Sequence, residues 1–185
     1  MSVLPIRVLG DPVLREATRI VGEVTDELRQ LIDDMFETMY VANGIGLAAP
    51  QVGRTERVFI AEVDGAAFAL VNPEIVTADG PKERNEEGCL SIPDVYGDVL
   101  RPSRVVVRAL DRDGAPIEVA ADGLLSRCFQ HEIDHLHGKL FIDHLSFLKR
   151  RAALAQWELE KDQYPGCIRI LKAGQSKSKH PEEEL

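Results

Sequence analysis

Residues 130–138, with the sequence QHEIDHLHG, have the spacing that a hydrolytic metal site requires. His131 and His135 are four residues apart, so on an α-helix their side chains lie on one face, about one turn apart. Two imidazoles placed in this way bind one metal ion when both are neutral. Glu132 is adjacent to the first histidine, where its carboxylate can take a proton from a water molecule. The stretch predicts a catalytic metal site on a helix.

The same stretch also fits an ordinary amphipathic helix with Phe129, Ile133 and Leu136 in the core and two incidental histidines. The metal site is favoured because two ligands and a base occur together in the HExxH spacing. A catalytic divalent metal usually has three protein ligands and one open position, so a third ligand is needed. The best candidate is Cys89, as a thiolate in a cysteine-poor chain. Cys128 is expected to face the core as a small apolar residue.

The overall composition is that of one globular domain. The 185 residues are 44% hydrophobic and 29% charged, which is enough to form a core without a structural metal. We find no apolar run long enough to span a membrane and no secretory signal. The three cysteines are a sparse, odd set, which indicates a reducing compartment and a soluble cytoplasmic protein. The net charge of -9 argues against broad nucleic-acid binding and specific DNA binding.

The N-terminal third of the chain predicts an arm, a helix and a glycine-rich loop. Residues 1–24 are expected to be extended, with turns at residues 10–12. Thr25 is the expected N-cap of a helix, because apolar residues then recur at helical spacing: Leu28, Leu31, Ile32, Met35, Phe36 and Met39. The loop at 43–53 contains Gly44 and Gly46, which permit backbone angles that other residues avoid. We expect another group to approach this backbone closely.

The middle of the chain predicts antiparallel strands. Residues 58–63 and 68–72 are β-rich runs with a turn at Gly65, and 75–78 continues the meander. Residues 80–85 are expected to form a polar loop. The clearest hairpin joins 105–110 to 117–120 through the sequence DRDG. Asp122 is then a candidate N-cap for the helix that carries the histidines.

The C-terminal part predicts a surface helix at 146–161, ended by Pro165 and Gly166, followed by a short strand within 167–171 and a frayed tail at 173–185. We therefore expect one catalytic domain at 1–164, including this helix, and a partly disordered extension at 165–185. Lys149, Arg150 and Arg151 make the start of the helix basic. These residues could contact an anionic partner transiently, although an ordinary solvated face is the favoured interpretation.

Three stretches together resemble one family, the peptide deformylases. The family's signature motifs are matched by GIGLAAPQ at 44–51, EGCLS at 87–91 and QHEIDHLHG at 130–138, in the same order and spacing. The resemblance covers about residues 4–148. It implies an α+β fold with antiparallel β-sheets around a central metal-binding helix, together with an N-terminal and a C-terminal helix. It also implies removal of the formyl group from the N-terminal formylmethionine of newly made polypeptides, with release of formate.

The resemblance also implies roles for particular residues. The metal ligands would be Cys89, His131 and His135, and Glu132 would be the acid and base. Gln51 and the backbone N–H of Leu90 would stabilise the oxyanion. Gly46 would contact the substrate backbone, and the pocket for the first side chain would be lined by Ile45, Leu124 and Cys128. Glu87 and Arg101 would form an ion pair behind the ligands.

The resemblance favours Fe²⁺ as the metal, whereas a thiolate with two imidazoles also suits Zn²⁺, Ni²⁺ or Co²⁺. Tyr96 departs from the pattern, because many bacterial members have arginine there, and tyrosine resembles the organelle-type branch. Recognition of substrate residues beyond the first is therefore expected to differ.

Two other functions fit parts of the pattern. An HExxH metallopeptidase would need a third ligand such as Glu158 or Glu160 from the later helix. The longer HExxHxxGxxH form is excluded, because Phe141 occupies the position of its final histidine. A non-catalytic module could bind formylated peptides or a metal without turnover. Such a module has no need of Glu132 as a base, so its presence favours an enzyme.

Overall fold

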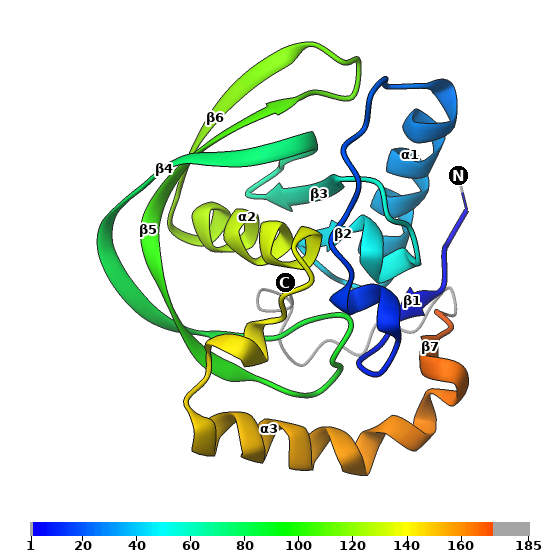
Figure 1. Cartoon of the computed structure of the whole chain (residues 1–185), viewed down its shortest axis with the longest axis vertical. Helices are drawn as coiled ribbons and strands as arrows, with labels where there is room; N and C mark the ends of the chain where they lie inside the picture. The colour runs from blue at the N-terminus through cyan, green and yellow to red at the C-terminus, as the bar shows by residue number, and fades with distance from the viewer. Residues whose placement is uncertain (1, 172–185) are drawn as a thin grey trace.

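A computed structural model describes residues 2–171 of the chain. The fold is α+β, as expected: within the described residues, a five-stranded antiparallel sheet curves around one helix, and a two-stranded sheet joins the two ends of the chain (Figure 1). The sheet order is β2-β3-β4-β5-β6 in the larger sheet and β1-β7 in the smaller one. No helix among residues 2–171 combines the length and the apolar character that crossing a membrane requires.

The first helix, α1, spans Asp26–Val41 and begins as predicted. The Thr25 side chain accepts a hydrogen bond from Leu28 N, which satisfies one of the N–H groups exposed at a helix start. One face of α1 is buried, including Ile32, Met35 and Met39, which have no exposed surface. This face packs in the same core cluster as Leu90, so α1 supports the loop that follows β4.

The large sheet is built from neighbouring segments of the chain, and its strands have different lengths. They are β2 (Gly46–Ala48), β3 (Val58–Val63), β4 (Ala66–Glu87), β5 (Gly97–Leu110) and β6 (Pro116–Asp122). The predicted turn at Gly65 is confirmed, as is the hairpin after Leu110, where Asp111 Oδ1 accepts hydrogen bonds from Asp113 N and Ala115 N. The long strands β4 and β5 form the curved arm around α2 in Figure 1.

The prediction of a polar loop at 80–85 was wrong, because these residues belong to β4 and pair with β5. The register between the two strands shifts at 71–74, 75–77 and 79–82. Such irregularities bend a strand and break the alternation of apolar and polar side chains that predicts it. Because residues 74–86 are also exposed, no apolar face remained to identify this part of the strand.

The second helix, α2, spans Gly123–Leu136 and lies inside the curve of β4, β5 and β6 (Figure 1). Phe129 and Leu136 pack in a core cluster with residues of β3, β4 and β5. Asp122 occupies the N-cap position, but its side chain makes no capping hydrogen bond. It instead accepts a hydrogen bond from Arg104 Nε at 2.9 Å. The helix therefore begins where expected, without the expected cap.

The C-terminal helix, α3, spans Phe147–Glu160, with the Ser146 side chain accepting from Lys149 N. It packs on the domain through Ala153 and Trp157. The predicted short strand is present as β7 (Ile168–Arg169), which pairs with β1 (Ile6–Arg7). Short 3-10 helices occur at Pro12–Arg15, Ala49–Val52, Phe141–His144, Lys161–Gln163 and Pro165–Cys167. The predicted tail at 173–185 lies outside the described residues.

Candidate active site

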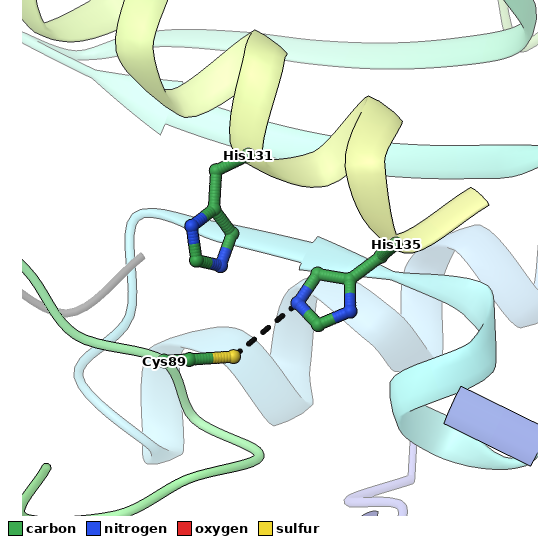
Figure 2. Close-up of side chains that lie close together, drawn as sticks. All are labelled: Cys89, His131 and His135. Atoms are coloured by element: carbon green, nitrogen blue, oxygen red, sulfur yellow. Dashed lines mark hydrogen bonds between the residues drawn. The ribbon is translucent and has the colours of Figure 1, made fainter. Parts of the chain in front are cut away.

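The three predicted metal ligands lie together (Figure 2). His131 and His135 extend from the same face of α2, and Cys89 comes from the loop after β4. One ligand atom from each residue lies within 4.8 Å of the others, and Cys89 Sγ is 3.2 Å from His135 Nε2. All three side chains are buried, with exposed fractions of 2%, 1% and 1% for Cys89, His131 and His135.

A buried carboxylate determines which nitrogen of His131 faces the cysteine. Glu87 Oε2 lies 3.1 Å from His131 Nδ1. Burial raises the pKa of Glu87, but the hydrogen bonds from His131 and Arg101 outweigh it and hold the pKa well below its usual range. An ionised carboxylate only accepts hydrogen bonds, so Nδ1 of His131 carries the proton and donates. In a neutral imidazole this arrangement leaves the lone pair on Nε2, the nitrogen that a metal ligand must offer.

The expected pair of Glu87 and Arg101 is present. Arg101 Nε and Nη2 donate to the two Glu87 oxygens at 2.6 and 3.0 Å. Its third donor, Nη1, reaches Asp134 Oδ2 at 2.9 Å, and the same oxygen lies 2.7 Å from His144 Nε2. Arg101 is therefore shared between two carboxylates, one behind His131 and one adjacent to His135.

Arg127, which was not among the predicted site residues, also binds Glu87. Its Nη1 donates to Glu87 Oε1 at 2.6 Å, and only 7% of its side chain is exposed. Arg127 lies one helical turn before His131, so the helical spacing alone could have placed it on the ligand face. No sequence signal indicated its partner, since Glu87 is 40 residues away.

Glu132 is fully buried, and neither of its oxygens has a hydrogen-bond partner among residues 2–171. Burial raises its pKa well above the usual value of a glutamate, and the nearby charge of Arg101 opposes that shift only in part. A buried carboxyl group without a partner is costly, and such groups mark functional sites. Glu132 thus has the environment of a proton-transfer group.

The glycine-rich loop approaches Glu132 closely. A β-carbon on residue 46 would lie 2.5 Å from Glu132 Oε1 and 2.8 Å from Cys128 Sγ. Gly44 and Gly46 were expected to allow unusual backbone angles, but neither has a positive φ. Lack of space explains these glycines instead, since a β-carbon on residue 44 would also lie 2.7 Å from Leu90 Cδ1.

Gln51 is held in a fixed orientation beside the cysteine. Ala48 N donates to its Oε1 at 2.8 Å, and a backbone N–H can bond only to the amide oxygen. The amide nitrogen is thereby turned toward the ligands, where Nε2 lies 3.6 Å from Cys89 Sγ. The amide has two N–H donors, so one contact with the sulfur leaves the second for another acceptor.

The loop of Leu90 is supported by both ends of the chain. Leu9 N donates to Ser91 O at 2.8 Å, and Arg169 Nη1 donates to Leu90 O at 3.4 Å. Leu9 follows β1, and Arg169 belongs to β7, so the small sheet lies directly behind the loop. This contact of the C-terminal strand with the site was not predicted from the sequence.

The other predicted substrate residues lie around the same loop and helix. Ile45 O accepts a hydrogen bond from Cys128 Sγ at 3.6 Å and another from Glu62 N at 2.8 Å. Cys128 is fully buried, as expected, whereas Leu124 at the start of α2 is exposed. Tyr96 is half-buried in the segment between the Cys89 loop and β5.

The residues fit a divalent metal. His131 Nε2 is buried and has no partner within the described part of the chain, although it faces the other two ligands. Burial, together with the nearby His131, lowers the pKa of His135 well below its usual value, so this imidazole is neutral. One sulfur and two imidazole nitrogens form a donor set for a transition metal with an open position. Glu158 on α3, proposed as a peptidase ligand, instead pairs with Lys161, which directly follows α3. The fold and site define a metal-dependent hydrolase of the HExxH type.

The comparisons with known proteins agree on one family. Residues 3–151 match the sequence profile of the polypeptide deformylases. A peptide deformylase from Hydrogenovibrio crunogenus is 54% identical over 163 residues, covering 86% of this chain and 96% of its own. A crystal structure of a peptide deformylase from Legionella pneumophila is 44% identical with a TM-score of 0.84, covering 88% of this chain and 97% of that one. Another, from Synechococcus elongatus in complex with actinonin, is 47% identical with a TM-score of 0.81, covering 84% and 86%.

The chain therefore belongs to the peptide deformylase family. Members of this family are hydrolases that remove the N-formyl group from nascent polypeptides, and they depend on a divalent metal. The resemblance of the three motifs and the expected fold are both confirmed.

Proposed function

We propose that the chain removes the formyl group of N-terminal formylmethionine with a single divalent metal held by Cys89, His131 and His135. The convergence of these three buried ligands beside Glu132 is the observation that carries the proposal. When bound, the metal ion supplies Lewis-acid activation of water and of the formyl carbonyl. The side chains around it bind the substrate, stabilise charge and move protons.

Glu132 is the proposed acid and base. Its carboxylate accepts a proton from the water that attacks the formyl carbon, and it returns a proton to the amine nitrogen as the carbon–nitrogen bond breaks. The products are formate and a free N-terminus. The lack of a competing hydrogen-bond partner among the described residues supports this role, because both oxygens of Glu132 remain available to the proton.

Gln51 and the N–H of Leu90 are the proposed donors to the formyl oxygen as negative charge builds on it. Ala48 N holds the Gln51 amide, and Arg169 donates to the carbonyl oxygen of Leu90, in the peptide group that follows the proposed N–H donor. Donors held in place before the reaction stabilise this charge without reorganising, and one such donor typically contributes about 100 to 1000-fold in rate.

The first side chain of the substrate is proposed to lie among Ile45, Leu124 and Cys128, with its backbone against Gly46. Ile45 packs against the apolar cluster that contains Cys128, and Leu124 is exposed at the start of α2. An unbranched, polarizable methionine suits an apolar slot of this kind. The proposed role of Tyr96 is recognition of substrate residues beyond the first.

Fe²⁺ is the proposed native metal, with Zn²⁺, Ni²⁺ and Co²⁺ as the alternatives that the same ligands accept. Anaerobic purification, elemental analysis and activity per metal would test this choice. Fe²⁺ should give the highest turnover and lose it in air. A highly active zinc form without oxygen sensitivity would contradict the assignment.

The proposed location is the cytoplasm, since the three cysteines of the chain are a sparse, odd set that fits a reducing compartment. A transient contact of α3 with the ribosome is the proposed route to nascent chains. Lys149 and Arg150 pair with Asp98 and Asp143, whereas no ion pair is found for Arg151 within residues 2–171. Replacing all three cations with alanine should weaken salt-sensitive cosedimentation with ribosomes and spare short formyl peptides. Unchanged cosedimentation at low salt would contradict this route.

The reaction itself is tested by formate release from formyl-Met-Ala with purified, metal-loaded protein. We expect stoichiometric formate and free Met-Ala, and no cleavage of the peptide bond. Cleavage of the peptide bond without release of formate would favour an HExxH peptidase instead.

A further inference from the structure

Four hydrogen bonds hold the buried carboxylate of Glu87. Its Oε1 accepts from Arg101 Nε and from Arg127 Nη1, both at 2.6 Å. Its Oε2 accepts from Arg101 Nη2 at 3.0 Å and from His131 Nδ1 at 3.1 Å. The position of His131 therefore depends on a carboxylate that two arginines orient together.

The two arginines differ in what else they bind. Arg101 also binds the carboxylate of Asp134, and these two paired side chains can move together. Arg127 binds the main chain: its Nη1 also donates to Val99 O at 3.1 Å, and its Nη2 donates to Glu83 O at 2.9 Å. These carbonyls belong to β5 and β4, so Arg127 connects Glu87 to the backbone of the sheet around α2.

The planar guanidinium suits this connection. Its N–H groups lie in a fixed plane and can bind a carboxylate and two carbonyls at once, which an ammonium group cannot do with the same geometry. Because Arg127 and His131 are one turn apart on α2, the same helix carries the ligand and the group that orients its carboxylate partner.

We propose that Arg127 is a positioning residue, which acts through Glu87 to keep His131 Nδ1–H on the carboxylate and Nε2 directed at the metal. The inference rests on the proposed assignment of His131 as a metal ligand. A hydrogen-bond partner of a metal ligand typically contributes about 10 to 100-fold to metal affinity. Loss of Arg127 should therefore appear as weaker metal binding, and not only as lower stability.

The experiment compares Zn²⁺ affinity by competition with a chromophoric chelator in wild type, Arg127→Met, Arg127→Lys and Arg104→Met. Arg104 is the matched control, because it is an arginine of β5 whose ion pair with Asp122 is exposed. We expect about 10 to 100-fold weaker binding in Arg127→Met, an intermediate value in Arg127→Lys and the wild-type value in Arg104→Met. The NMR signal of the His131 Nδ1–H should be slow to exchange in the wild type and fast in Arg127→Met.

A merely structural role would lower the melting temperature of Arg127→Met without changing Zn²⁺ affinity or the imidazole signal of the folded protein, and this result would overturn the proposal. If Arg127→Met does not fold, Arg127→Lys decides: wild-type affinity with an unchanged signal overturns the proposal. The variant His131→Ala tests the assignment of His131 as a metal ligand separately from the role of Arg127. Wild-type Zn²⁺ affinity in that variant would refute the ligand assignment as well, whereas weakened binding there with normal binding in Arg127→Met would refute only the role of Arg127.

Discussion

Glu132 packs so closely against Gly46 that a β-carbon on residue 46 would lie 2.5 Å from its Oε1. Gly46 lies in β2, which is paired with β3, so the backbone cannot easily move away. The carboxylate must move instead. Gly46 therefore leaves the space that the carboxylate of Glu132, the proposed base, occupies.

The substitution Gly46→Ala should displace Glu132 and lower kcat by about 100-fold or more, since general acid–base catalysis contributes about 10² to 10⁴-fold. Metal content should stay at the wild-type value, because the three atoms nearest to such a β-carbon belong to Glu132 and Cys128 and not to a proposed ligand. Steady-state formate release and elemental analysis would measure both. Gly22→Ala is the matched control, as nothing lies within 4 Å of a β-carbon there. A wild-type kcat in Gly46→Ala would show that Glu132 tolerates displacement.

We predict that Asp143 makes the free energy of unfolding depend on pH in the acid range. Burial raises its pKa, but hydrogen bonds from Arg15 and from Leu140 N outweigh it, so the pKa lies below the usual value. A group with a lowered folded pKa stabilises the fold above its unfolded pKa of about 4, and this contribution is lost as the pH falls through the folded pKa.

Asp143→Asn should therefore lower the free energy of unfolding at pH 7 by about 1 kcal/mol, a value reduced for the partial exposure of Arg15. The difference from wild type should shrink as the pH falls below about 4. Urea unfolding of the metal-free proteins at several pH values would measure it. The exposed Asp64, substituted by asparagine, serves as the control and should behave as wild type. A pH-independent difference would rule out the charge of Asp143 as its cause.

We predict that β7 contributes to catalysis through Arg169. This strand lies beyond the family match at residues 3–151. Arg169→Ala removes the hydrogen bond to Leu90 O and should loosen the proposed oxyanion donor. A hydrogen bond of about 0.5–1.5 kcal/mol corresponds to roughly a 2 to 10-fold lower kcat with little change in KM. Arg108→Ala, which removes an exposed pair with Glu118, is the control. A change confined to KM would indicate a role in substrate binding instead.

Removal of the metal should destabilise the folded protein. A ligand present at 100 times its Kd stabilises the native state by about 2.7 kcal/mol, provided that it does not bind the unfolded chain. Chelation should therefore lower the melting temperature, and restoring the ion should raise it again. Cys89→Ala should weaken this response strongly, whereas Cys167→Ala should keep it. An equal response in both variants would argue against Cys89 as a ligand.

The sequence predicted the elements that carry strong local signals. Thr25 opens α1, the DRDG turn forms its hairpin, and the HExxH spacing places both histidines on one face of α2. Cys89 was also expected beside the two histidines, since few other thiols were available, and the three side chains lie together in the structure.

What the sequence could not predict depends on contacts between distant segments. Residues 80–85 form part of β4 because they pair with β5, although their composition is that of a loop. Asp122 has the residue type of an N-cap, but its side chain accepts a hydrogen bond from Arg104 on the neighbouring strand instead. Arg127 was missed because its partners, Glu87 and two carbonyls, come together only when the sheet closes around α2.

The most direct test of the central claim is a paired measurement of metal content and formate release in Glu132→Gln. Glutamine has nearly the same size as glutamate but cannot accept and return the proton. We predict one metal ion per chain, as in wild type, with formate release from formyl-Met-Ala lowered by at least about 100-fold. Turnover at the wild-type rate with the metal in place would contradict the account.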